Sequence, residues 1–208
     1  MNNMTNDIIK MSSAIVETGY DILEGLKRSD ISLLEKAIEQ LAVVDINANK
    51  IDNKIISSMP LLCKNESSAR ELVSYFRIVS EFVQTARVLR YFCRYVLTYT
   101  NGHPFMTMKE YILNIFQLSI DAFMISAQLV EKRAYIDDIF RQVKTKQAAG
   151  RELFAKLEKN IMEFDIKYTL NCTRVLNAAE KLDEVFKAAV SVVKVILLIQ
   201  DCGKLRIC

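Results

Sequence analysis

Glycine and proline are scarce in this chain of 208 residues, which contains five glycines, two prolines and no tryptophan. So few chain breakers exclude a turn-rich β-sandwich or β-barrel and indicate long helices. The five glycines are also scattered, so the glycine-rich phosphate loop of Rossmann and P-loop enzymes is missing. Hydrophobic residues make up 51% of the chain, enough for a substantial core. The sequence therefore predicts an all-α protein.

A strong charge of one sign is also missing, since the formal net charge is only +3. This balance does not indicate a nucleic-acid-binding protein. The five cysteines are odd in number and contain no C-x-x-C, so they indicate a reducing compartment rather than a disulfide framework or a zinc site. The polar N-terminus does not resemble a signal peptide, and the longest apolar run, 188–199, is too short to span a membrane. We expect a soluble, cytoplasmic protein.

The spacing of apolar residues predicts helices over about 5–26, from 30 or 32 to about 60, and from about 65 to 99. Gly102 and Pro104 mark the clearest break in the chain. A second helical block starts near 107, with a softer break expected near Gly150 and a last helix over 151–200. The pattern predicts two tandem repeats, 5–99 and 106–201, and a short tail, 202–208, that contains Cys202 and Cys208. The alternative is one irregular helical bundle.

Residues for catalysis are few. The single histidine, His103, lies beside Pro104 and is expected to be an exposed loop residue. No cysteine is paired with a histidine in a nucleophile signature, and no Glu-x-x-His pair of a di-iron bundle is present. The sequence gives no positive case for an enzyme.

Carboxylate pairs at helical spacing are the clearest candidates for a site. Glu180 and Glu184 are four residues apart, so on a helix they lie on one face and can offer oxygens to one cation. The alternative is a solvent-exposed, charge-balanced face that also includes Lys181 and Asp183. The pair Asp137-Asp138, and Asp45 with Asp52, are further candidates of the same kind.

Arginines form a stripe late in the first block. Arg87, Arg90 and Arg94 follow i, i+3, i+7 spacing, so they share one helix face. Such a stripe can bind phosphate groups, a nucleic acid or an acidic partner. We favour the alternative, in which Glu side chains of a neighbouring helix balance it.

Two stretches carry a resemblance to a known family. Residues 77–87, Arg-Ile-Val-Ser-Glu-Phe-Val-Gln-Thr-Ala-Arg, and residues 174–184, Arg-Val-Leu-Asn-Ala-Ala-Glu-Lys-Leu-Asp-Glu, resemble the third helix of each repeat in the PhoU family of phosphate-uptake regulators. The resemblance implies two tandem three-helix bundles and a non-enzymatic regulator of phosphate transport or signalling that acts by protein–protein contact. It further implies a phosphate transporter or sensor as partner, no nucleic acid, at most a peripheral place at the membrane, and a homodimer.

The resemblance also implies where a metal would bind. In several members a Glu and an Asp four residues apart bind metal; here Glu180 stands at the first position and Glu184 at the second. Asp137 matches an acidic residue of the second helix, with Arg133 one turn before it. The metal candidates are therefore Glu180, Glu184 and Asp137, with iron, zinc, manganese or magnesium as the ion. A carboxylate-based metal-binding bundle is the alternative function.

The first repeat departs from that pattern. Val83 and Arg87 stand where the family has its metal-binding carboxylates, so this repeat is expected to bind no metal. We hypothesise that the Arg87 guanidinium replaces the charge of the ion and pairs with Asp52 or Glu81.

Overall fold

Every element of the described chain is an α-helix. The computed structural model describes residues 2–62, 66–99, 103–162 and 169–200. They form α1 (Asn2–Arg28), α2 (Ile31–Leu62), α3 (Glu66–Tyr99), α4 (His103–Glu131), α5 (Ile136–Met162) and α6 (Thr169–Gln200). The predicted all-α class is confirmed. The expected division near Gly102 falls between α3 and α4, while residues 100–102 and the tail with Cys202 and Cys208 lie outside the described residues.

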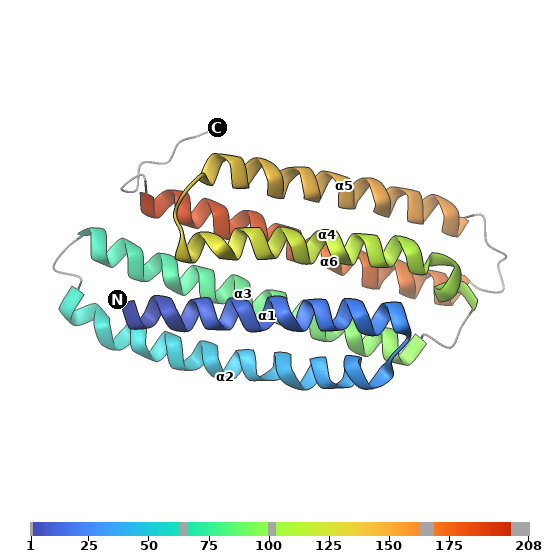
Figure 1. Ribbon diagram of the computed structural model, residues 1–208, viewed down its shortest axis with the longest axis horizontal. Coiled ribbons are helices and arrows are strands. Elements are labelled where there is room, and N and C mark those ends of the chain that lie inside the picture. Colours follow the sequence, from blue (N-terminus) through green and yellow to red (C-terminus); the bar gives the residue numbers. More distant parts are fainter. Residues whose placement is uncertain (1, 63–65, 100–102, 163–168, 201–208) are drawn as a thin grey trace.

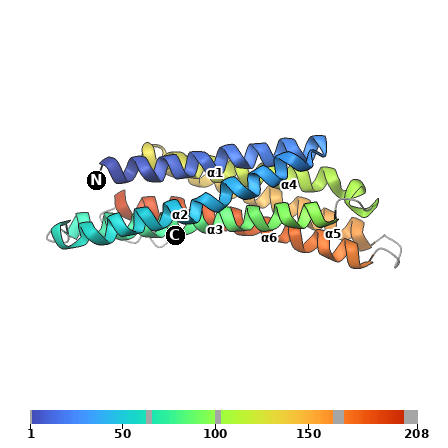
Figure 2. The same cartoon turned by 90° about the horizontal axis from the view of Figure 1, so that it is seen from below.

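The six helices form two three-helix units that lie side by side (Figure 1). Helices α1, α3, α4 and α6 occupy the middle, with α1 and α4 above α3 and α6 in the view of Figure 2. Helix α2 flanks α1 and α3, and α5 flanks α4 and α6. Because α3 packs against α6 as extensively as it packs against α2, the tandem units share one hydrophobic core.

Helix α2 shows how the sequence produces this packing. Its buried positions repeat with alternating steps of three and four residues, so they form one stripe along the helix. The stripe consists of Leu34, Ala37, Leu41, Val44, Ala48, Ile51 and Ile55. Asp30 accepts hydrogen bonds from the backbone amides of Ser32 (3.0 Å) and Leu33 (3.3 Å), which caps the helix.

The predicted break near Gly150 is wrong. Helix α5 runs without interruption from Ile136 to Met162, and Gly150 is buried within it. A Cβ atom at this position would lie 2.7 Å from two ring atoms of Phe186 on α6. Gly150 therefore permits a close approach of α5 and α6 instead of ending a helix.

The first break in the second unit is the turn 132–135 between α4 and α5, which was not predicted. Tyr135 adopts a positive φ of 57° there, as does Ser29 in the turn between α1 and α2. The turn contains neither glycine nor proline, so no chain breaker marks it. Arg133 consequently lies in this turn and not on a helix one turn before Asp137.

A polar cluster links the two units at α1, α4 and α5. The Tyr20 hydroxyl donates a hydrogen bond to Oδ1 of Asp121 (2.9 Å), and the Lys146 ammonium forms an ion pair with Oδ2 (3.2 Å). Burial, with the hydrogen bond to Asp121, raises the pKa of Tyr20 to about 12. Tyr20 therefore stays protonated at neutral pH and acts as a donor between the units.

Helix α4 contains a segment, Met108–Glu131, long and apolar enough to cross a membrane by length and composition. Half of the residues of that segment are buried in the bundle. Its exposed residues are all polar, namely Glu110, Asn114, Gln128 and Glu131. These are properties of the core helix of a soluble protein.

Candidate functional site

The predicted carboxylate pair lies on α6, where α6 packs against α3. Oε1 of Glu184 accepts a hydrogen bond from Lys181 (2.7 Å), and Oε2 accepts one from Gln84 of α3 (2.8 Å). The Lys181 bond is the larger cause of a lowered pKa of Glu184, against the effect of partial burial. Glu180 is exposed and forms no hydrogen bond or ion pair with the described residues.

Asp183 is turned to the other side of α6, toward α5. It forms ion pairs with Arg151 (3.2 Å) and Lys187 (2.9 Å). Partial burial acts to raise the pKa of Asp183, but the hydrogen bonds from Lys187 and Arg151 outweigh it and lower that pKa. Lys181 pairs with Glu184 in the same way, so two acidic side chains of this stretch are paired with three basic ones.

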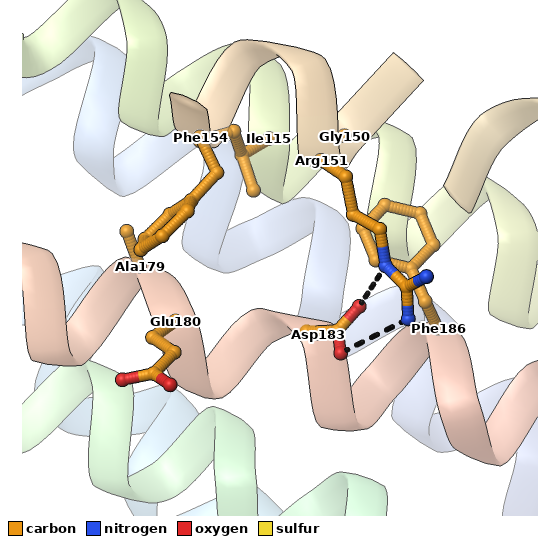
Figure 3. A pocket seen from close by; sticks show the side chains of 8 residues that line it. All are labelled: Ile115, Gly150, Arg151, Phe154, Ala179, Glu180, Asp183 and Phe186. Carbon is orange, nitrogen blue, oxygen red and sulfur yellow. Dashed lines mark hydrogen bonds and ion pairs between the residues drawn. The ribbon is translucent and has the colours of Figure 1, made fainter. Parts of the chain in front are cut away.

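A small cavity of about 210 Å³ lies between α4, α5 and α6 at this position. Its walls are mostly apolar and include Ile115, Phe154 and Phe186, while the Arg151–Asp183 ion pair lies at one side. Figure 3 shows the Glu180 carboxylate turned away from that pair. The cavity therefore offers apolar contact but no converging carboxylates.

Asp137, the third predicted metal ligand, lies elsewhere. It is exposed in the first turn of α5, beside Tyr135 and Arg141, and close to Leu197 of α6. Leu197 is about 20 Å along α6 from Glu184 at about 1.5 Å per residue. The helix dipole stabilises a carboxylate in the first turn of a helix, which explains an acidic residue at position 137 without a metal.

The described residues do not fit the metal that the PhoU resemblance implies. Both carboxylate oxygens of Glu184 are already hydrogen-bonded, and the Lys181 ammonium lies at the place where a cation would approach. Asp137 is too far away to complete the set. Within the described chain, no three or more His, Cys, Asp or Glu side chains gather closely enough to hold an ion. This geometry matches the alternative of a charge-balanced face.

Two members of the arginine stripe, Arg87 and Arg90, are balanced by the neighbouring helix α2, but by an aspartate and not by the expected glutamate. Arg87 donates to Oδ1 of Asp45 through Nε (3.2 Å) and through a terminal nitrogen (2.8 Å). Arg90 donates to Oδ2 of the same carboxylate (3.1 Å). The hypothesis that Arg87 pairs with Asp52 or Glu81 is therefore wrong. Glu81 accepts a hydrogen bond from Ser191 of α6 instead (2.6 Å).

Candidate catalytic groups are few in the described chain. Cys93 is completely buried, and burial raises the pKa of its thiol to about 12, so it does not form a thiolate at neutral pH. The side chain of His103 lies outside the described residues.

Sequence reasoning missed the contacts between the two units. Gln84 was not among the candidate residues, yet its side-chain amide donates a hydrogen bond to Glu184 of the other unit. Residues 84 and 184 come together because α3 and α6 run antiparallel through the middle of the molecule (Figure 1). A register between two helices so far apart in the sequence leaves no local signal.

No family model and no curated protein matches the sequence. Two solved structures share its fold over almost the full length. The phosphate transport system regulatory protein PhoU from Streptococcus pneumoniae superposes with a TM-score of 0.78 at 14% sequence identity, covering 99% of this chain and 97% of that one. PhoU from Pseudomonas aeruginosa gives a TM-score of 0.67 at 13% identity and 97% coverage of both chains. The class is thus an all-α protein of two tandem three-helix bundles. The fold is that of PhoU.

Proposed function

We propose that this protein is a non-enzymatic regulator of phosphate transport or phosphate signalling that acts through protein–protein contact. The observation that carries the proposal is the match to the PhoU fold along almost the whole of both chains. A fold alone does not define an activity, so the residues must be compatible with it.

The residues support a contact function in two respects. The thiol of Cys93 is inert, and the cavity near Glu180 is small and largely apolar. Several large apolar side chains are exposed on α2 and α3, including Ile56 and Phe76. Exposed apolar side chains that gather on one side of a helical protein are typical of a surface for a partner.

The partner that the fold favours is a component of a phosphate transporter or a phosphate sensor. The protein would bind it in the cytoplasm, with at most a peripheral place at the membrane surface. A homodimer remains part of the proposal. The alternative, a carboxylate-based metal-binding bundle, has no supporting ligand set within the described residues. Metal analysis of the purified protein, described below, tests it.

Deletion of the gene in its own host tests the proposal. In medium with abundant phosphate, we expect the deletion strain to show altered uptake of radioactive phosphate, or expression of phosphate-starvation genes that the wild type represses. A plasmid copy of the wild-type chain should restore the wild-type response. Unchanged uptake and unchanged starvation genes in the deletion strain would refute the phosphate role.

A further inference from the structure

Exposed apolar side chains are concentrated on one helical hairpin. Nine large apolar residues of the described chain are strongly exposed, and seven of them lie on α2 and α3. They are Ile31, Val43, Ile46 and Ile56 on α2, and Val73, Phe76 and Tyr91 on α3. Because single exposed apolar residues are normal, the question is which of these side chains lie together.

The Asp45–Arg87 contact fixes the register of the hairpin. Ile56 follows Asp45 by eleven residues on α2, and Phe76 precedes Arg87 by eleven residues on α3. Eleven residues are close to three full helical turns, so each residue lies on the same side of its helix as the ion pair does. Since α2 and α3 are antiparallel neighbours, this register places Ile56 and Phe76 side by side on one face of the hairpin. They are 58% and 46% exposed.

Val73 extends this apolar patch. It is 51% exposed and precedes Phe76 by three residues, which places it about one turn further along the same face of α3. We use the name hairpin groove for the surface formed by Ile56, Val73, Phe76 and Asp52. It lies toward the end of the bundle where α2 ends and α3 begins (Figure 1).

Asp52 is the charged residue of the hairpin groove. It precedes Ile56 by four residues and follows Asp45 by seven, so it lies on the groove side of α2. Its Oδ1 atom is buried, and no group of the described chain donates a hydrogen bond to it. Burial raises the pKa of Asp52. Asp45 by contrast forms ion pairs with two guanidinium groups, so of the two carboxylates on this helix face only Asp45 has a counter-charge among the described residues.

The side chains around Asp52 do not supply a counter-charge. The neighbouring surface positions Asn49, Asn53 and Ser80 are uncharged. The two nearest lysines, Lys50 and Lys54, each stand two residues from Asp52 and therefore about 160° from it around α2, and Lys54 is occupied by Asp7 of α1 (2.5 Å). The hairpin groove therefore combines an apolar patch with one carboxylate that has no partner in the described part of the chain.

We propose that the hairpin groove is the docking site for an amphipathic helix of a partner protein, which carries an arginine or lysine about one turn from its apolar residues. The inference rests on the proposed function, since it names the surface and the kind of partner through which the protein would act. The apolar residues of the partner pack on Ile56, Val73 and Phe76, and its cation pairs with Asp52.

Charge provides the specificity. An acidic or uncharged helix in the same groove would bury Asp52 further without giving it a donor, which is unfavourable. A second copy of this chain is a poor occupant for the same reason. A two-fold contact through the groove presents the same surface from both sides, so it places two carboxylates and no additional cation in one interface.

A selection experiment tests the inference on the full chain. The probe is a library of random peptides of about 16 residues, enough for more than four helical turns, displayed on phage. We expect enriched peptides to have apolar residues at i, i+3 or i+4 and i+7, with an arginine or lysine next to this stripe. Synthetic copies, measured by fluorescence anisotropy, should bind Phe76→Ser about tenfold more weakly and Asp52→Asn about fivefold more weakly.

A matched control comes from the same helix. Ile46 is 56% exposed, close to the 58% of Ile56. It follows Asp45 directly, so it points about 100° around α2 from the side that carries Asp45 and the hairpin groove. Ile46→Ser should leave peptide affinity unchanged. Because all three changed side chains are at least partly exposed, thermal unfolding of each variant serves to check that the fold is kept.

The opposite results are equally specific. The inference is overturned if the library yields no binder, if the enriched peptides are acidic, or if their affinity does not respond to Phe76→Ser and Asp52→Asn. It is also overturned if light scattering finds a dimer that Phe76→Ser dissociates, because the occupant is then a second copy.

The same variants separate this inference from the phosphate role. If peptides bind the hairpin groove but the deletion strain has normal phosphate uptake and normal starvation-gene expression, the phosphate role is refuted and the docking site is supported. If the deletion strain has a phosphate phenotype and the Asp52→Asn/Phe76→Ser double variant complements it fully, the docking site is refuted and the phosphate role is supported.

Discussion

Gly150 of α5 packs directly against the ring of Phe186 on α6. A Cβ atom at residue 150 would approach the ring atoms to 2.7 Å, so even alanine requires the two helices to separate. Alanine favours a helix over glycine by about 1 kcal/mol, whereas overpacking a core costs about 1–3 kcal/mol. We expect Gly150→Ala to lower stability by about 1 kcal/mol and Gly150→Leu by more than about 3 kcal/mol.

Thermal or urea unfolding measures this effect. The exposed neighbour Ala148 is the control, and Ala148→Leu should be neutral within about 0.5 kcal/mol. Should Gly150→Ala prove more stable than the wild type, the glycine would be a tolerated defect of the helix and not a packing requirement.

The case of Gly150 also shows why only part of the fold could be predicted from the sequence. Apolar spacing is a local signal, so it revealed the helical character of the chain, and Gly102 with Pro104 revealed the division between the two units. Glycine is ambiguous, because one residue type serves both chain breaks and close helix packing. The turn at Tyr135 was missed because its positive φ is held by a residue that gives no turn signal.

The candidate site was less predictable than the fold. Asp45 and Asp52 are seven residues apart and occupy the same face of α2, so the sequence could not tell which one meets Arg87. The pairing of Gln84 with Glu184 depends on the packing of two separate units. Such choices are made by tertiary register and not by local pattern.

Asp52 should destabilise the folded protein at neutral pH. Because burial raises its pKa in the folded state, the folded protein binds the proton more tightly than the unfolded chain does. Stability linked to Asp52 is therefore full below the ordinary pKa of 3.8 and is lost as the pH rises from there through the raised pKa. We expect Asp52→Asn to unfold at a higher temperature than wild type at pH 7.

The difference between wild type and Asp52→Asn should shrink toward zero as the pH falls below 3.8. Asp45→Asn is the matched comparison, since it leaves Arg87 and Arg90 without their shared carboxylate and should lower stability at pH 7. Calorimetry of both variants across the acidic range checks these signs. Equal melting temperatures for Asp52→Asn and wild type at pH 7 would contradict the assigned burial.

Arg133 fixes the turn between α4 and α5 to the first unit. It forms an ion pair with Glu71 of α3 and donates to the hydroxyl of the buried Tyr75 (3.0 Å), which also donates to Glu71 (2.7 Å). We expect Arg133→Ala to cost about 1–3 kcal/mol, since it removes charged hydrogen bonds from partly buried groups. Arg141→Ala breaks an exposed ion pair with Asp138 and should cost less than about 0.5 kcal/mol.

A double-mutant cycle of Arg133→Ala and Glu71→Gln, measured by urea unfolding, isolates the pair. Strictly additive effects would mean that the turn is held by other contacts.

Arg87 tests whether a guanidinium supports the first unit. Arg87→Glu places a carboxylate beside Asp45 and should lower stability by about 1 kcal/mol, a modest value because Arg87 is largely exposed. Arg87→Gln, which removes the charge without reversing it, should cost less. The difference between the two variants should decrease at high salt, since salt screens exposed charges. Equal stability of wild type and Arg87→Glu at low salt would show that Arg87 has no structural role.

Elemental analysis decides between the regulator and the metal-binding alternative. Protein purified without chelators should contain no stoichiometric iron, zinc, manganese or magnesium, because Lys181 and Gln84 already occupy the Glu184 carboxylate and Asp137 lies at another place on the bundle. The Glu180→Ala/Glu184→Ala variant should then have the same metal content as wild type. About one ion per chain in the wild type, lost in this variant, would require Lys181 to move away and Glu180 to turn toward Glu184. That result would establish the metal site and make the carboxylates of α6, rather than the hairpin groove, the first place to look for regulation.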